Sequence, residues 1–170
     1  MAAKKASRPQ PDAFEVYCYA VTYKMSTERL GEQKPTRPYI IPAAVFEALA
    51  LEVFFKCLYR IKRKDIPEHH DLKELFERLD DADKKSASNK FDAIVMVNDG
   101  NKHKLTLPGV LDRCKNFFEV MRYGYEASLS ADQAAVVPLN LGLWSAVEAV
   151  QSLILDAEPT FAARAEADLQ

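Results

Sequence analysis

Five basic side chains fall within a nine-residue segment, KCLYRIKRK, that contains no acidic residue. They are Lys56, Arg60, Lys62, Arg63 and Lys64. Such a cluster can follow the phosphates of a nucleic acid, because each contact releases counterions. The alternative needs no ligand, since lysine and arginine are favoured in the last turn of a helix, where they oppose the negative end of its dipole. Both interpretations fit the sequence.

Two adjacent histidines follow this basic segment. Arg63 and His69 are separated by five residues, and His70 comes next. A cation and an imidazole at this spacing could supply charge and a general acid or base for RNA cleavage, so His70 is the candidate catalytic residue. The alternative is that His70 or Asp71 caps a short helix and orders the loop before it. Spacing alone favours the capping role.

Charged residues also interrupt apolar or aromatic stretches at two distant places. Glu52 and Lys56 lie four residues apart in a largely apolar segment, and RYGYE holds Arg122 and Glu126. A buried charge without a partner costs several kcal/mol, so we expect these two sets to meet in one cleft. The alternative for RYGYE is a set of local ion pairs with Glu119, each contributing about 0.3–0.5 kcal/mol.

The composition is that of an ordinary globular protein. The 170 residues carry 23 basic and 25 acidic side chains, with a pI near 6.0. The overall charge therefore does not mark a nucleic-acid or membrane binder. No apolar run approaches the length of a transmembrane helix, and the first residues lack an apolar signal region. We expect a cytoplasmic protein that does not bind membranes.

Known motifs for metal or cofactor chemistry are absent from the sequence. It contains no glycine-rich phosphate loop, CxxC, HExxH or GxSxG. The three cysteines, Cys18, Cys57 and Cys114, are odd in number, far apart and set in apolar stretches, which is typical of reduced, buried thiols. We expect no metal site and no cofactor.

Helical periodicity runs through most of the chain and predicts an all-α fold of about five or six helices. The expected helices cover residues 13–30, 43–62, 72–79, 81–97, 108–126 and 140–158, and the proline-rich segment 32–42 is expected to be a linker. A strand over FEVYCYAVTY is the alternative for the first helix, but no second strand pattern accompanies it. The architecture expected is an antiparallel up-and-down bundle formed by residues 12–158, with tails over 1–11 and 159–170.

The segment AVFEALALEVFFKCLYR, the basic loop and HHDLKELFERL together resemble the HEPN family, named for higher-eukaryote and prokaryote nucleotide-binding proteins. The likeness lies in Ala50-Leu51-Glu52 with Lys56 four residues on, and in His70-Asp71-Leu72 before an amphipathic helix. It covers residues 40–80 well. It extends more loosely to Glu126, where RYGYE looks like the Arg-Tyr-x-Tyr-Glu ending of some members.

This resemblance implies a bundle of four or five helices, often a homodimer, in a family whose active members cleave RNA without metal or are paired with nucleotidyltransferases. Active members carry Arg, four to six residues, then His near the start of a late helix. This chain departs from that pattern, because no His follows Arg113 or Arg122 at that spacing. The family's usual nuclease motif is therefore missing.

Three functions remain, and the leading one is binding of RNA or a nucleotide, or of a partner protein, without that motif. Its expected binding residues are Glu52, Lys56, Arg60, Arg63, His70, Arg122, Tyr123 and Glu126. The second is a structural or regulatory homo-oligomeric module, which places Tyr123, Tyr125 and Trp144 at an interface. The third is a metal-independent ribonuclease that uses His70.

Overall fold

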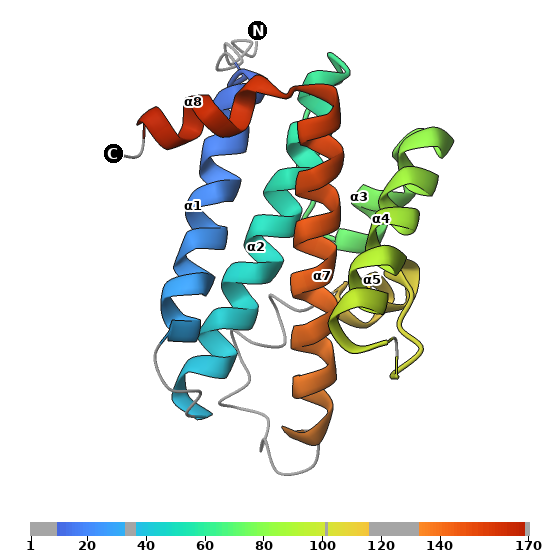
Figure 1. Ribbon diagram of the computed structural model, residues 1–170. Coiled ribbons are helices and arrows are strands. Elements are labelled where there is room, and N and C mark those ends of the chain that lie inside the picture. The colour runs from blue at the N-terminus through green and yellow to red at the C-terminus, as the bar shows by residue number, and fades with distance from the viewer. Residues whose placement is uncertain (1–9, 33–36, 101, 116–132, 169–170) are drawn as a thin grey trace, which may run out of the picture.

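The computed structural model describes residues 10–32, 37–100, 102–115 and 133–168, in which the chain forms seven helices and no strand. The all-α prediction is confirmed. Figure 1 shows α1, α2 and α7 side by side, with α4 and the short helices α3, α5 and α8 around them. Their bounds are α1 Ala13–Glu32, α2 Arg37–Ile61, α3 Leu72–Glu77, α4 Asp81–Asp99, α5 Leu107–Cys114, α7 Gln133–Ala157 and α8 Thr160–Asp168.

Helix α2 is the centre of the bundle because it packs against both α1 and α7. On the far side, α7 packs against α4 and α5, while α3 lies between α2 and α5. The colours of Figure 1 show that α1 and α2 run in opposite directions and that α2 and α7 run in the same direction. The neighbouring helices α2 and α7 are therefore parallel, which differs from the fully antiparallel bundle expected from the sequence.

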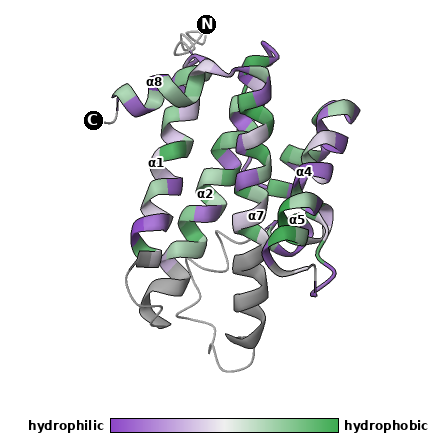
Figure 2. Ribbon diagram, viewed as in Figure 1, coloured by the Kyte–Doolittle hydropathy of each residue, from purple (hydrophilic) through white to green (hydrophobic). Residues whose placement is uncertain are grey.

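Apolar side chains of these helices pack together in one core. Figure 2 shows in green the hydrophobic residues that occur along α2 and α7. Along α2 the fully buried set includes Leu51, Phe54, Phe55 and Leu58. Helix α7 contributes Leu143, Val147, Val150 and Ile154 to the same core. Each such side chain stabilises the fold by about 1.5–3 kcal/mol relative to exposure to water.

Local signals set one boundary of each of the helices α3, α4 and α5. The Asp71 carboxylate accepts a hydrogen bond from the backbone N–H of Glu74 at 3.0 Å and caps α3. Gly100 ends α4 with a φ of 65°, in the left-handed region that favours glycine. Pro108 lies in the first turn of α5, where its missing N–H costs no helical bond.

Two helices extend beyond the predicted bounds. Helix α2 begins at Arg37 and includes Pro38 and Pro42, so most of the segment expected to be a linker is helical. Pro38 lies in the first turn, where a backbone N–H has no helical partner. Pro42 removes a single backbone hydrogen bond near the N-terminal end of a helix of 25 residues. Helix α7 begins at Gln133, seven residues before the expected start.

The expected tail over 159–170 instead contains α8. This helix buries Phe161 and Ala165. The ring of Phe161 lies 5.3 Å from that of Phe14 and 5.4 Å from that of Tyr17, both on α1. Burial of this aromatic cluster stabilises a helix whose sequence is too short to show a clear apolar stripe.

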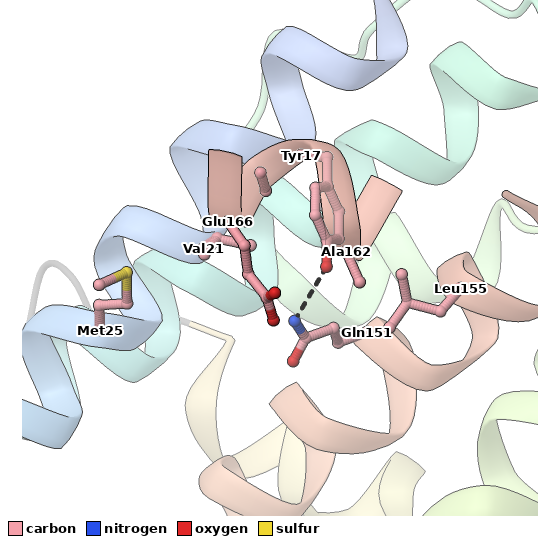
Figure 3. A pocket seen from close by; sticks show the side chains of 8 residues that line it. Tyr17, Val21, Met25, Gln151, Leu155, Ala162 and Glu166 are labelled. Atoms are coloured by element: carbon pink, nitrogen blue, oxygen red, sulfur yellow. Dashed lines mark hydrogen bonds between the residues drawn. The ribbon is translucent and has the colours of Figure 1, made fainter. Parts of the chain in front are cut away.

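A pocket of about 320 Å³ lies between α1, α7 and α8 (Figure 3). A second hollow of about 450 Å³ adjoins it between α1, α4 and α7, and Gln151 and Leu155 of α7 line both. Neither is lined by a residue that the sequence predicts to be functional. No helix in the described ranges is long and apolar enough to cross a membrane.

Glu47 of α2 is a buried carboxyl group that folding removes from water. Its side chain belongs to the buried polar set, 5% exposed, and Oε2 has no hydrogen-bond partner among the described residues. Burial raises the pKa of Glu47 from 4.5 to about 8 because the charged form is poorly solvated there. The group is therefore a neutral carboxylic acid at neutral pH.

The Glu47→Gln variant should remove one part of the pH dependence of stability. Because the folded pKa is raised, stability from Glu47 is complete below about pH 4.5 and is lost as pH rises to about 8. At pH 8 the variant should exceed the wild type in free energy of unfolding by roughly 4 kcal/mol, with little difference at pH 4.5. Urea unfolding at several pH values measures this, with exposed Glu68→Gln as control. If the free energy of unfolding changed with pH in the same way for the wild type and Glu47→Gln, the prediction would be contradicted.

Candidate functional site

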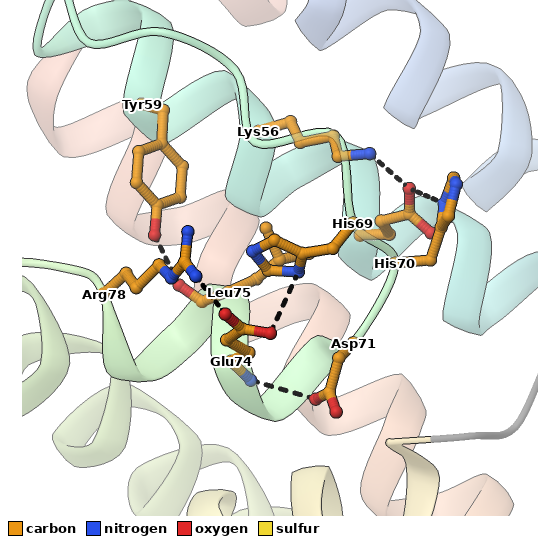
Figure 4. A network of polar contacts seen from close by, with 9 residues as sticks. Lys56, Tyr59, His69, His70, Asp71, Glu74, Leu75 and Arg78 are labelled. Carbon is orange, nitrogen blue, oxygen red and sulfur yellow. Dashed lines mark hydrogen bonds and ion pairs between the residues drawn. The ribbon is translucent and has the colours of Figure 1, made fainter.

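Three of the predicted site residues meet where α2 passes the loop before α3. Glu52 and Lys56 project from successive turns of α2, and His70 directly precedes Asp71, the N-cap of α3. Figure 4 shows the side chains of Lys56 and His70, both of which contact Glu52. The cap fixes the backbone next to His70, so α3 holds the histidine in place while α2 holds the acid and the lysine.

A single oxygen of Glu52 binds both neighbours. The Lys56 Nζ donates to Glu52 Oε1 at 2.6 Å, and the Nδ1 of His70 lies 2.8 Å from the same atom. The other oxygen, Oε2, is buried and has no hydrogen-bond partner in the described part of the chain. The Glu52 side chain is 5% exposed, that of Lys56 14%, and that of His70 71%.

This geometry fixes the tautomer of His70. A carboxylate only accepts hydrogen bonds, so the Nδ1 of His70 must carry the proton in this contact. In the neutral ring the Nε2 is then a free acceptor on a largely exposed imidazole. The same arrangement of carboxylate and imidazole orients general bases in enzymes, and Lys56 adds a nearby positive charge.

A second polar network supports the loop that carries His70. The Tyr59 hydroxyl donates to the carbonyl of Leu75 at 2.8 Å and ties α2 to α3. Glu74 forms an ion pair with Arg78, and the Nδ1 of His69 lies 3.7 Å from its other oxygen (Figure 4). Both ring nitrogens of His69 are buried without a hydrogen-bond partner among the described residues. His69 therefore faces inward while His70 faces solvent.

Most of the basic segment is engaged by protein groups. Lys62 lies 3.3 Å from Asp83, and Lys64 lies 2.7 Å from Asp80, where its hydrogen bond lowers the pKa of the Asp80 carboxyl. The Arg60 guanidinium donates to the carbonyl of Pro11 at 3.0 Å. These contacts favour the structural interpretation of the segment.

Arg63 differs from the other basic residues of this segment. It is exposed, has a positive φ of 56°, and its side chain has no ion-pair partner in the ranges that the structure describes. Arg63 and His70 lie on the same loop between α2 and α3. Among the described basic residues expected to bind phosphate, Arg63 alone needs no protein contact broken first.

The remaining predicted residues, Arg122, Tyr123 and Glu126, lie outside the described residues, as does Tyr125. Their expected approach to Glu52 and Lys56 stays a prediction. Trp144, the other expected interface residue, is partly buried on α7, and the Lys24 ammonium lies 5.2 Å from its ring centre. This cation–π contact accounts for Trp144 without a second copy of the chain.

The thiols are poor candidates for chemistry. Burial raises the pKa of both Cys57 and Cys114 to about 12, so they are protonated at neutral pH. Cys18 is partly buried and all three thiols are free. Within the described ranges no group of three His, Cys, Asp or Glu side chains is placed to hold a metal ion.

The sequence predicted the members of the Glu52 cluster but not which of them touch. The structure pairs Glu52 with Lys56 and with His70, while the expected meeting with Arg122 and Glu126 stays a prediction because those two residues lie outside the described ranges. The sequence feature that could have indicated the contact between His70 and Glu52 is the position of His70 immediately before Asp71, the capping residue of α3. In this chain the residue before the N-cap of α3 lies beside α2, on which α3 packs.

Comparison of the chain with protein-family models, curated proteins and solved structures gave no match. The likeness to HEPN proteins therefore rests on the motifs quoted from the sequence.

The Lys56→Met variant should be destabilised by about 2 kcal/mol, because it leaves the buried Glu52 carboxylate with one donor fewer. Combining it with Glu52→Gln should recover much of that loss, since the double variant buries no unpaired charge. Chemical denaturation of both single variants and the double variant measures the coupling. Lys73→Met, which breaks the exposed pair with Asp112, should leave stability almost unchanged. If the losses in free energy of unfolding from Lys56→Met and Glu52→Gln simply added in the double variant, the pairing of Lys56 with Glu52 would be contradicted.

Proposed function

We propose that this chain is a HEPN-like helical domain that binds RNA or a nucleotide through Lys56, Arg63 and His70, with the Glu52 carboxylate holding Lys56 and His70 in place. The observation that carries the proposal is the contact of Lys56 and His70 with one oxygen of buried Glu52. The two motifs behind the resemblance, Glu-x3-Lys and His-Asp-Leu, thus meet in space. This meeting follows from the packing of α3 on α2, and it places the exposed imidazole of His70 beside the Lys56–Glu52 pair.

The exposed groups suit a nucleotide ligand. The His70 imidazole offers a face on which a base can stack and an edge that can contact phosphate or sugar. Arg63, on the same loop, can bind a phosphate through its guanidinium. Lys56 adds positive charge at short range, although its ammonium is shared with Glu52. Contacts of this kind make binding sensitive to salt.

The proposal includes the wider expectations of the resemblance. These are a homodimer or a partner protein, and a cytoplasmic location. Trp144, which is partly buried and lies beside Lys24, stays a predicted interface residue. Sedimentation of the full chain measures the oligomeric state.

His70→Ala should weaken binding of a labelled single-stranded RNA at least fivefold, because loss of one stacking contact costs roughly 1 kcal/mol or more. Wild-type binding should weaken steadily with added salt. Fluorescence anisotropy at several salt concentrations measures both effects. His103→Ala is the matched control, since His103 is also exposed but lies in the loop before α5. Equal affinities of the two variants, or no salt-sensitive binding by the wild type, would rule out the proposed site.

A second candidate function is metal-independent cleavage of RNA with His70 as general base. It is favoured by the 2.8 Å contact between the Nδ1 of His70 and Glu52, which leaves the exposed Nε2 free to accept a proton from a ribose hydroxyl. Such a base abstracts the 2′-hydroxyl proton as the 2′-oxygen attacks the adjacent phosphorus and the 5′-oxygen leaves with a proton from water.

Cleavage predicts that the purified wild type degrades RNA in the presence of EDTA. The His70→Ala variant, prepared in the same way, should lose at least about a hundredfold in rate, which is the usual contribution of a general base. The rate for His103→Ala should equal that of the wild type. Gel analysis of an end-labelled RNA measures these rates. If the wild type is inactive, or if His70→Ala retains full activity, the chain is not a nuclease of this kind.

A further inference from the structure

The pocket between α1, α7 and α8 has one polar end and apolar walls. Tyr17 of α1, Gln151 of α7 and Glu166 of α8 form the polar end, and Figure 3 shows the Glu166 side chain extending toward the other two. Val21, Leu155 and Ala162 are among the apolar residues that line the rest. The volume of about 320 Å³ lies within the range of small-molecule sites.

Hydrogen bonds fix the orientation of the Gln151 amide. The Lys24 Nζ donates to its Oε1 at 2.8 Å, so the amide nitrogen points the other way and donates to the Tyr17 hydroxyl at 3.1 Å. Tyr17 is 1% exposed, and the hydrogen of its own hydroxyl has no acceptor among the described residues. A buried O–H without an acceptor is unfavourable, and a ligand carbonyl would satisfy it.

Glu166 supplies the negative charge of the pocket. Its carboxylate has no ion-pair partner in the part of the chain that the structure describes, and no basic side chain lines this pocket. Lys24 is directed to the other side of Gln151, where it also lies near Glu28 and the ring of Trp144. The polar end therefore presents a hydrogen-bond donor beside an unpaired carboxylate.

We propose that this pocket binds a small organic ammonium compound with an apolar body and a carbonyl group next to the ammonium. The apolar body would lie against Val21, Leu155 and Ala162, the carbonyl would accept from the Tyr17 hydroxyl, and the ammonium would pair with Glu166. This site is separate from the Glu52 cluster and does not depend on the function proposed for it.

Three probes that differ by one group each test the proposal on the full chain. Phenylalaninamide carries the phenyl, the carbonyl and the ammonium, 3-phenylpropanamide lacks the ammonium, and 2-phenylethylamine lacks the carbonyl. Isothermal titration or ligand-detected NMR gives the three affinities. Phenylalaninamide should bind at least threefold more tightly than either of the other two.

Two variants assign each preference to a residue. Glu166→Gln should abolish the preference for phenylalaninamide over 3-phenylpropanamide, and Tyr17→Phe should abolish the preference over 2-phenylethylamine. The matched controls are Asp168→Asn, exposed on the same helix, and Tyr19→Phe, which is 58% exposed on α1. Both should keep the wild-type preferences. Circular dichroism confirms that each variant is folded.

Several results would overturn the proposal. They are absence of binding by all three probes, equal affinity of the wild type for the three, or preferences that persist in Glu166→Gln and Tyr17→Phe. Loss of the preferences in the control variants would equally exclude the assigned roles. RNA binding by the Glu52 cluster is measured separately, so failure here leaves that function unaffected.

Discussion

A carboxylate that folding removes from water is stable only if hydrogen-bond donors or positive charges lie beside it. Glu52 is such a carboxylate, and it lies on α2, the central helix of the bundle. Helix α2 is held between α1 and α7 by its apolar residues, so Glu52 cannot turn to solvent without disturbing the core. Lys56, one turn further along α2, contributes a positive charge and a hydrogen bond to Glu52. His70 contributes a second hydrogen bond from the loop before α3. The loop before α3 is thereby tied to α2 by charge as well as by packing.

Helix α2 carries two buried acids, Glu47 and Glu52, which differ in whether hydrogen-bond donors lie beside them. Glu47 has no hydrogen-bond donor among the described residues, and burial raises its pKa to about 8. It is therefore buried in its protonated, uncharged form at neutral pH. Glu52 instead has two donors on one oxygen. A neutral buried acid needs no cation and organises nothing around it. A paired carboxylate fixes the positions of its partners, and this is why we place the functional site at Glu52.

The sequence predicted elements whose causes are local. Asp71 caps α3, Gly100 ends α4 and Pro108 begins α5, because each effect depends on a few neighbouring residues. The extension of α2 through Pro42 and the formation of α8 depend on packing against distant helices, which periodicity does not report. The contact of His70 with Glu52 joins residues 18 positions apart and was missed for the same reason. Glu166 was overlooked because its segment was expected to be a tail.

The proton position on His70 tests the central claim most directly, because it reports the contact with Glu52 in the folded protein without any substitution. Two-bond ¹H–¹⁵N correlation spectra of the full chain distinguish the two neutral tautomers, and exposed His103 serves as a reference within the same molecule. The account predicts that neutral His70 carries its proton on Nδ1, bound to Glu52. A His70 ring protonated on Nε2 when neutral, with Nδ1 open to water, would contradict it.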